Sequence, residues 1–243
     1  MLGAVLIDVG GTLWPNSWPR QPQDDRERIR RLREAVPTLT EGEASELVGI
    51  LGAAEHPRTE RQETAALVNE AIRKVRPGAG IPPPALPAAM SLPARGRVRP
   101  FPGARQLLTG LAGRGIRVII ASNVLWRDGL AHRQDFEDLG LADFVTACVS
   151  SVDVGWRKPH PNFFEAALSA AEQPAHQCAM VGDSETNDIR PAHTLGMLTV
   201  RVAIEEPMPA QSVATHVCGS LGQVAELLFS ELDGRRHSKT VLR

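Results

Sequence analysis

Four short segments of this chain place polar or charged residues directly after apolar runs that have the composition of strands. The first segment, residues 4–13, delivers Asp8 at the end of an apolar run, and Gly10, Gly11 and Thr12 follow it. A carboxylate beside a tight backbone turn can attack phosphorus and form a covalent intermediate. Glycines let the backbone come close to a bound group. Asp8 is therefore the candidate nucleophile, and the alternative interpretation is an ordinary aspartate that caps a turn.

The next two segments supply a hydroxyl, an amide and a cation. Ser122 and Asn123 end an apolar run that begins at Ile119 and can donate hydrogen bonds to phosphate oxygens, although a single serine at a strand end is often only a turn residue. Lys158 stands before Pro159 at the entrance of a predicted helix and is one of three lysines in the chain. A compact cation there would neutralise a carboxylate–phosphate pair.

The fourth segment supplies two more carboxylates. Asp183 follows a predicted strand, and Asp188 begins a predicted helix that it can also cap. Mg²⁺ prefers hard oxygen ligands, keeps several waters and uses only one or two carboxylates besides a substrate phosphate. We expect Asp8 and Asp183 to be direct ligands of Mg²⁺, with the main-chain carbonyl of Gly10 as a third protein oxygen. Asp188 is expected to lie in the outer shell or to orient a ligand.

In their order and combination, these segments resemble the four motifs of the haloacid dehalogenase (HAD) superfamily of phosphohydrolases, in the branch with a small helical cap. The resemblance covers residues 1–13 and 100–230, which is nearly all of the expected core. It implies a doubly wound parallel α/β sheet of the Rossmannoid type, an aspartyl-phosphate on Asp8, Mg²⁺ as cofactor and a small phosphorylated metabolite as substrate. The phosphate-binding residues that it implies are Gly11, Thr12, Ser122, Asn123 and Lys158.

One position departs from the family pattern. The usual D-x-D-G-T reads D-x-G-G-T here, so Gly10 stands where the resemblance places the acid that protonates the leaving alcohol and then activates water. Losing such catalysis costs about 10²–10⁴-fold in rate. Three outcomes are open: a leaving group that needs little protonation, a proton supplied by the cap or the substrate, or a catalytically impaired phosphate-binding or regulatory protein.

Two other chemistries of the family also vary this position. Relatives that displace halide carry tyrosine there, and the absence of tyrosine from this chain argues against dehalogenation. Relatives that cleave carbon–phosphorus bonds carry alanine there and use a cap lysine as a Schiff base. Lys74 is the only lysine of the expected cap, and two cations, Arg73 and Arg76, lie beside it in the sequence. A lysine on a solvated helix face is the simpler interpretation.

Strand and helix patterns alternate from residue 102 onward, which favours a parallel sheet with helical crossovers. The predicted strands are 4–8, 117–121, 144–149, 178–181, 198–202 and 216–217, and the predicted core helices are 103–112, 127–139, 161–171, 188–195 and 221–232.

Between the first two motifs, the apolar spacing predicts helices at 24–36, 40–51 and 59–75, followed by a proline-rich stretch at 77–100 with a helical turn near 85–90. We therefore expect an α/β core at 1–16 and 100–232, a helical cap with its return loop at 17–99 and a flexible tail at 233–243. Trp14 and Trp18 are expected either to line the substrate mouth or to pack at the hinge between core and cap.

Composition limits the remaining possibilities. The chain has 243 residues, 42% hydrophobic content and a formal net charge of −1, which gives no drive toward nucleic acid or an anionic membrane. No apolar run approaches the length of a membrane span. The three cysteines show no metal-ligand spacing, so we expect reduced thiols and a cytoplasmic protein, either a monomer or a homodimer. His132, His193 and His216 lie outside the motifs and are expected to be structural.

Overall fold

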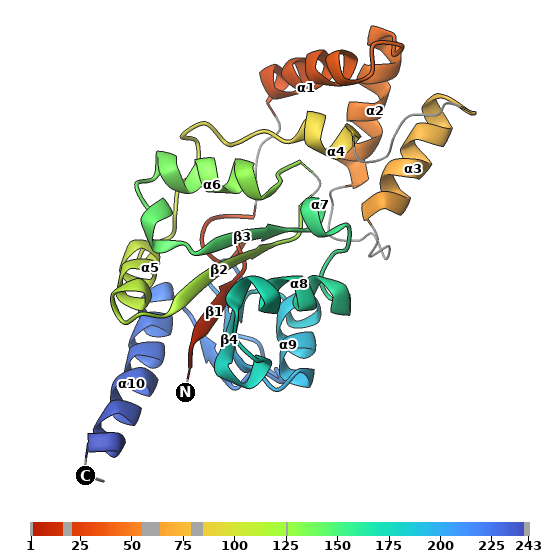
Figure 1. Cartoon of the computed structure of the whole chain (residues 1–243). Helices are drawn as coiled ribbons and strands as arrows, with labels where there is room; N and C mark the ends of the chain where they lie inside the picture. Colours follow the sequence, from red (N-terminus) through yellow and green to blue (C-terminus); the bar gives the residue numbers. More distant parts are fainter. Residues whose placement is uncertain (1, 17–20, 55–63, 79–84, 125, 241–243) are drawn as a thin grey trace.

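The protein is built around a six-stranded sheet with the strand order β3-β2-β1-β4-β5-β6, in which every neighbouring pair is parallel (Figure 1). The computed structural model describes residues 2–16, 21–54, 64–78, 85–124 and 126–240. The expected doubly wound α/β fold is confirmed. The strands are β1 (Ala4–Ile7), β2 (Arg117–Ser122), β3 (Ala147–Ser150), β4 (Cys178–Gly182), β5 (Leu198–Val202) and β6 (His216–Cys218).

Helices bury both faces of this sheet, which explains why its central strands are apolar without a break. Alternate residues of β1 face opposite sides: Val5 and Ile7 pack with one apolar cluster, and Ala4 and Leu6 pack with another. The first cluster includes side chains of α5 (Ala104–Gly113), α6 (Gly129–Asp138) and α10 (Leu221–Thr240). The second includes side chains of α8 (Pro161–Ala171) and α9 (Arg190–Thr194).

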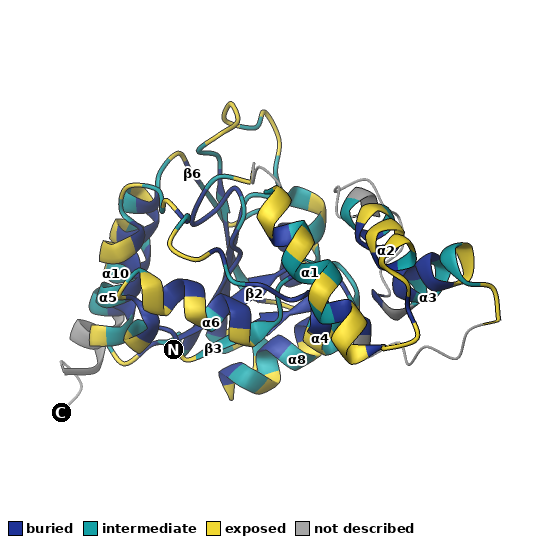
Figure 2. Cartoon of the chain, turned by 90° about the horizontal axis from the view of Figure 1, so that it is seen from above, coloured by how far each residue is buried: buried dark blue, intermediate teal, exposed yellow. Residues whose placement is uncertain are grey.

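Four helices between β1 and α5 form a separate group at one end of the molecule, far from the C-terminus (Figure 1). They are α1 (Pro22–Ala35), α2 (Glu41–Ala54), α3 (Thr64–Val75) and α4 (Ala85–Met90). Buried side chains such as Leu32, Leu47 and Leu86 join them in an apolar cluster of their own. In Figure 2 these helices turn exposed residues outward and buried residues toward one another. The helical insertion expected before the second motif is present in this position.

The helical group is joined to the sheet domain by specific contacts. Trp126, from the loop after β2, packs in the apolar cluster of the four helices, and the Arg28 guanidinium lies 5.2 Å from the centre of its ring. The main-chain N–H of Leu92 donates to the Trp126 carbonyl at 3.0 Å, and that of Thr64 donates to the Gly155 carbonyl at 2.8 Å. These contacts set the position of the helical group over the loops that follow β2 and β3.

The boundaries of several predicted elements are wrong. The helix predicted at 188–195 is a π-turn, η3 (Glu185–Ile189), that leads into the short helix α9. The strand predicted at 144–149 begins only at Ala147, because a 3₁₀ turn, η1 (Ala142–Phe144), precedes it. The short elements α7 (Ser151–Val154) and η2 (Ala175–Gln177) were not predicted.

The helix predicted at 221–232 also ends too early, because α10 continues through Thr240. An ion pair between Asp233 and Arg114 of 3.2 Å ties Asp233 to the end of α5. The flexible tail expected at 233–243 stays a prediction. Trp18 and residues 59–63 of the predicted cap helix lie outside the described residues.

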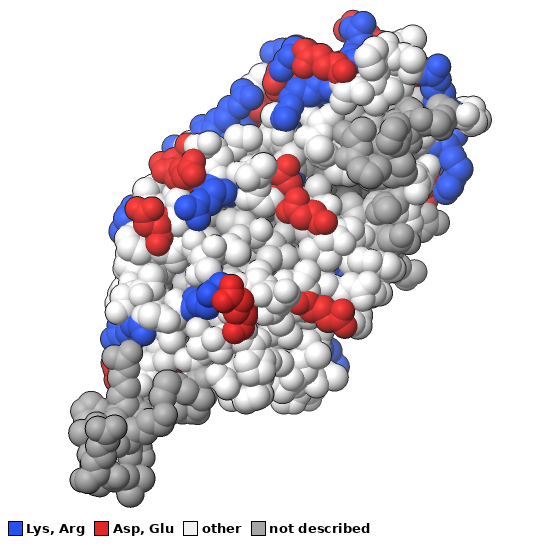
Figure 3. All heavy atoms as spheres, in the orientation of Figure 1, with Lys and Arg blue, Asp and Glu red and all other residues white. Residues whose placement is uncertain are grey.

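The surface carries charges of both signs (Figure 3), and the three cysteines form no disulfide. Acidic and basic side chains are interspersed on the face shown in Figure 3. Cys148, Cys178 and Cys218 are all free thiols. In the parts of the chain that the structure describes, no helix has both the length and the apolar character needed to cross a bilayer.

Candidate active site

The functional candidates gather at one edge of the sheet because parallel strands end at the same side. Asp8 directly follows β1, Ser122 ends β2, and Asp183 directly follows β4. β1 lies between β2 and β4 and pairs with both, so these three strand ends are adjacent. The main-chain N–H of Asp8 donates to the Val181 carbonyl at 2.9 Å and extends this pairing to the candidate nucleophile.

The backbone after Asp8 makes a closed turn that fixes the carboxylate. The N–H of Leu13 donates to the Val9 carbonyl, and the N–H of Gly11 donates to the Trp14 carbonyl, both at 2.8 Å. Gly11 has a φ of 77°, a conformation that side chains disfavour. The Thr12 hydroxyl then donates to Asp8 Oδ2 at 3.2 Å. Thr12 is thus placed beside the nucleophile, as the resemblance implies for a residue of the phosphate site.

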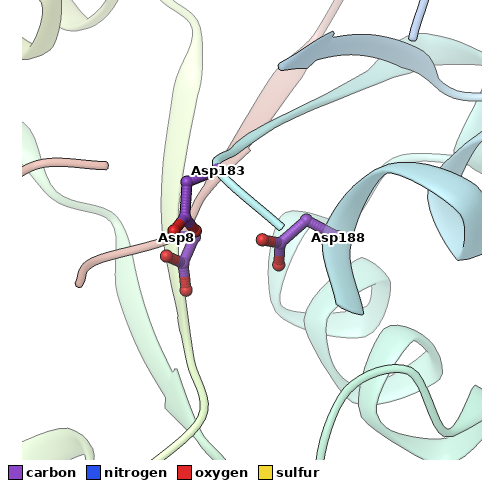
Figure 4. Close-up of side chains that lie close together, drawn as sticks. All are labelled: Asp8, Asp183 and Asp188. Carbon is purple, nitrogen blue, oxygen red and sulfur yellow. The ribbon is translucent and has the colours of Figure 1, made fainter. Parts of the chain in front are cut away.

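Three carboxylates converge at this edge. Ligand atoms of Asp8, Asp183 and Asp188 all lie within 4.8 Å of one another, and Figure 4 shows their carboxylates turned toward a common point. Glycines make this approach possible: a Cβ on Gly11 would lie 2.4 Å from Asp183 Oδ2, and a Cβ on Gly182 would lie 2.5 Å from Asp188 Oδ2. No larger residue fits at either position without displacing a carboxylate.

Burial and the neighbouring carboxylates both disfavour ionisation of this cluster. Burial, reinforced by Asp8 and Asp188, raises the pKa of Asp183 to about 8. Burial also raises the pKa of Asp188 to about 6, although the neighbouring Lys158 acts in the opposite direction. A group of acids that resists ionisation in this way is a favourable site for a cation, because the cation would remove the repulsion.

Lys158 is the buried cation of the site. Its Nζ donates to Asp8 Oδ1 and Asp188 Oδ1, both at 2.6 Å, and to the Ala121 carbonyl at 2.8 Å. Burial alone would lower the pKa of the ammonium, but Asp188 and Asp8 outweigh it and raise the pKa above its usual range. Lys158 is therefore charged and links the candidate nucleophile Asp8 to Asp188 in η3.

Asn123 has a role that the sequence did not predict. Its side-chain amide donates to the Lys158 carbonyl at 2.9 Å and accepts from the Lys158 N–H at 2.8 Å. Both polar atoms of Asn123 therefore hold the backbone of the lysine loop in this structure. Ser122 is buried at the end of β2, next to the carbonyl of Ala121 that holds Lys158.

Three other candidates from the sequence have structural roles here. Trp14 is buried in the main core, with its ring centre 5.4 Å from that of Phe136, so it does not line a substrate mouth. Lys74 is exposed and pairs with Glu70 at 3.1 Å on the same helix, as a solvated lysine does. His132 is completely buried in α6, as expected for a structural histidine.

The structure also reveals groups around the site that the sequence did not indicate. Arg201 on β5 donates to the main-chain carbonyl of Asp183 at 3.3 Å and to Glu185 at 3.2 Å. Glu185 lies in the same motif as Asp183, yet it accepts from Ser212 at 2.6 Å and from the N–H of Val213 at 3.1 Å. Glu185 therefore anchors the loop between β5 and β6. The one signal in the sequence that marks Glu185 is its position in the same acidic motif as Asp183.

A further contact joins that loop to Asn16, which lies just beyond the first motif. The N–H of Asn16 donates to Glu205 Oε2 at 3.1 Å, across 189 positions of sequence. No pattern in the sequence could have paired these residues, because Glu205 stands in a polar loop with an equally polar neighbour, Glu206.

Sequence comparisons agree with this arrangement. A family model described as haloacid dehalogenase-like hydrolase matches residues 2–196. The glyceraldehyde 3-phosphate phosphatase of Methanocaldococcus jannaschii is 33% identical over 107 residues, which are 43% of this chain and 45% of that protein. The enzyme of the same name from Methanopyrus kandleri is 31% identical over 215 residues, 83% of this chain and 84% of that protein. The chain spans about half the length of the first curated relatives that it matches.

Comparison of structures supports the fold. The crystal structure of a HAD phosphatase from Thermococcus onnurineus superposes with a TM-score of 0.57 at 19% identity, covering 93% of this chain and 98% of that one. At this level of identity the likeness concerns the architecture of the sheet and its helical insertion.

Proposed function

The chain belongs to the haloacid dehalogenase-like hydrolases, and on that premise we propose that it hydrolyses phosphate monoesters of small metabolites through an aspartyl-phosphate on Asp8. The observation that carries the proposal is the placement of Asp8: its carboxylate is buried at a strand end, it accepts from Thr12, and the Lys158 ammonium lies 2.6 Å away. A charged nucleophile held in this way approaches phosphorus without reorganisation of its surroundings.

The proposed reaction uses the residues of the site in two stages. Asp8 attacks phosphorus, and the bond from phosphorus to the ester oxygen breaks. Water then attacks the phosphorus of the aspartyl-phosphate, which restores the Asp8 carboxylate and releases inorganic phosphate. Lys158 stabilises the negative charge that Asp8 and the transferring phosphoryl group share, and the Thr12 and Ser122 hydroxyls are the proposed donors to the phosphoryl oxygens. The Gly11 N–H, which the resemblance assigns to the phosphate site, donates to the Trp14 carbonyl in this structure.

The same residues fit a divalent cation. Three hard carboxylates with one lysine leave an excess of negative charge, and the raised pKa of Asp183 marks the group that a cation would stabilise most. We propose that Asp8, Asp183 and the Gly10 carbonyl hold Mg²⁺, with Asp188 as outer partner. The ion would neutralise charge on the phosphate and its nucleophile.

The names of the relatives narrow the substrate class that we propose. The archaeal relatives from M. jannaschii and M. kandleri are named for a phosphorylated triose, and a relative from Rhodospirillum rubrum for phosphoglycolate. All these are short, anionic, phosphorylated carbon chains. We propose a substrate of this size for the present chain, with the helices α1–α4 as the element that selects it.

A phosphate-binding protein with little turnover is the second candidate, because Gly10 offers no acid to the leaving group. The two candidates differ in one observable. An enzyme releases phosphate in excess over protein from at least one ester, whereas a binder does not.

The experiment is a phosphate-release screen with Mg²⁺ over phosphorylated trioses, phosphoglycolate, sugar phosphates and an aryl phosphate. Acid quenching during turnover, followed by peptide mass spectrometry, should find phosphate attached to the peptide that contains Asp8. Binding of the same compounds without release of phosphate would favour the second candidate and contradict the proposed hydrolysis.

A further inference from the structure

The space that the missing acid would fill is taken by another residue. Gly10 is not among the glycines with positive φ, so its backbone would accept a side chain. A Cβ built on Gly10 would lie 2.7 Å from Asn16 Oδ1 and 3.4 Å from Asn16 Cγ. The amide of Asn16 therefore occupies the place into which a side chain at residue 10 would extend. An amide can donate and accept hydrogen bonds there, but it cannot transfer a proton.

The main chain of Asn16 binds a carboxyl group from another loop. Its main-chain N–H donates to Glu205 Oε2 at 3.1 Å. Glu205 follows β5, which ends at the same edge of the sheet as β1 and β4, and β4 lies between β1 and β5. From there the Glu205 side chain reaches Asn16, which follows the first motif. The loop that carries it is anchored by Glu185, which accepts from Ser212 and from the N–H of Val213. The Glu205 side chain is exposed, so solvent reaches it.

We propose that Glu205 is the acid–base group that replaces the missing carboxyl at residue 10, with Asn16 as the positioning residue between it and the reacting atoms. This inference rests on the proposed function. As the bond from phosphorus to the ester oxygen breaks, the protonated Glu205 gives its proton to that oxygen and becomes a carboxylate. The carboxylate then accepts a proton from the water that attacks the aspartyl-phosphate, so the carboxyl group is restored and the products are one alcohol and one inorganic phosphate.

The other carboxylates of the site are less suited to this step. Asp8 is the nucleophile, and Asp188 is held by Lys158 at 2.6 Å and by the N–H of Ser184 at 3.1 Å. Asp183 is assigned to the metal. Glu205 accepts from the Asn16 N–H and takes no part in these contacts.

The test replaces Glu205 by glutamine and uses Glu206→Gln as the matched control. Glutamine keeps an oxygen that can accept from the Asn16 N–H, so a merely structural tether survives, whereas proton transfer does not. We expect Glu205→Gln to lower kcat/KM for an alkyl phosphate by about 10²-fold or more. The value for an aryl phosphate should change by only a few-fold, because the aryl oxide leaves without protonation. Glu206→Gln should leave both values at those of the wild type.

A second variant keeps the test decisive if the loop is perturbed. Asn16→Ala opens the space at residue 10, and Gly10→Asp then returns an acid to the family position. In a Glu205→Gln background, this pair should restore alkyl turnover by about 10-fold or more, with thermal melts as the check on folding. Glu205→Gln with wild-type alkyl turnover would overturn the inference and leave the proposed function standing. Equal losses for alkyl and aryl esters would also overturn it, because they would indicate a structural role. A wild-type protein that hydrolyses no ester would refute the proposed function itself.

Discussion

Removal of the Lys158 charge is the most informative single perturbation of this site. Lys158 is 3% exposed, and its Nζ holds Asp8 and Asp188 at 2.6 Å each. In Lys158→Met, a side chain of similar length but without charge leaves these carboxylates without their cation. Breaking a buried ion pair in this way costs about 3–5 kcal/mol. In a protein of this size 1 kcal/mol shifts Tm by about 2–4 °C, so we expect a fall of roughly 6–20 °C.

The loss of stability in Lys158→Met should depend on pH, and the carboxylates determine the direction of this dependence. The pKa of Asp188 is raised to about 6 even with Lys158 present, and removal of the ammonium raises it further. A carboxyl group whose folded-state pKa lies above its unfolded value binds protons more tightly when folded, so its stabilising protonation is lost as pH rises. The variant should therefore lose more stability at pH 8 than at pH 6, by about 1.4 kcal/mol for each additional unit of pKa shift.

Thermal melts at pH 6 and pH 8, with and without Mg²⁺, measure these effects. Mg²⁺ should raise the Tm of the variant more than that of the wild type, because the variant site carries one more uncompensated negative charge. Lys74→Met is the matched control: this lysine is exposed and has one ion pair within its helix, worth about 0.5 kcal/mol or less. A Lys158→Met protein that melts within about 2 °C of the wild type at pH 8 would refute the idea that the acidic cluster depends on this cation.

Three further results are expected. Asp8→Asn should retain the fold but lower phosphate release to below about 1% of the wild type, because an amide does not attack phosphorus; turnover of several per cent would exclude covalent catalysis by Asp8. Asp183→Ala should weaken Mg²⁺ binding at least about 10-fold by calorimetry, and an unchanged affinity would remove this residue from the metal site. Burial, with a contribution from Arg127, lowers the pKa of His132 to about 3. Because the pKa of an unfolded histidine is near 6.5, the free energy of unfolding should fall by about 1.4 kcal/mol per pH unit as the pH drops below 6.5. Urea titrations should find this slope in the wild type and in His193→Leu, and should find it absent in His132→Leu.

The sheet and the acidic site were predictable from the sequence because both depend on local pattern. Each strand of a doubly wound sheet is a short apolar run, and its polar residue must emerge at one edge. Asp8, Ser122 and Asp183 satisfy that rule one strand at a time, so parallel pairing alone brings them together. Lys158 was predictable for a different reason: a lysine in a chain with few lysines, before a helix, resembles a known motif.

The roles of side chains that contact a distant loop could not be predicted from the sequence. The sequence predicts that Asn123 donates to a phosphate oxygen, whereas its side chain holds the Lys158 backbone in the structure. This contact joins two loops that meet only in the folded chain. The sequence left Trp14 either at the substrate mouth or at the hinge between core and cap, and the turn after Asp8 places it in the main core. The end of α10 was misplaced because Asp233 and Gly234 form a stop signal in the sequence, whereas the helix continues through Thr240.

The glycines of the site differ in a way that explains the departure at residue 10. Gly11 and Gly182 are required by their surroundings, since a Cβ at either one would lie within 2.5 Å of a carboxylate oxygen. A Cβ on Gly10 would lie 2.7 Å from Asn16 Oδ1, which a rotamer change can move, and 3.6 Å from the Asn16 backbone, which is an ordinary contact. The backbone therefore does not require glycine at residue 10. A side chain introduced at residue 10 would compete with that of Asn16 for one space, and the main-chain hydrogen bond from Asn16 to Glu205 fixes the backbone that carries the Asn16 side chain.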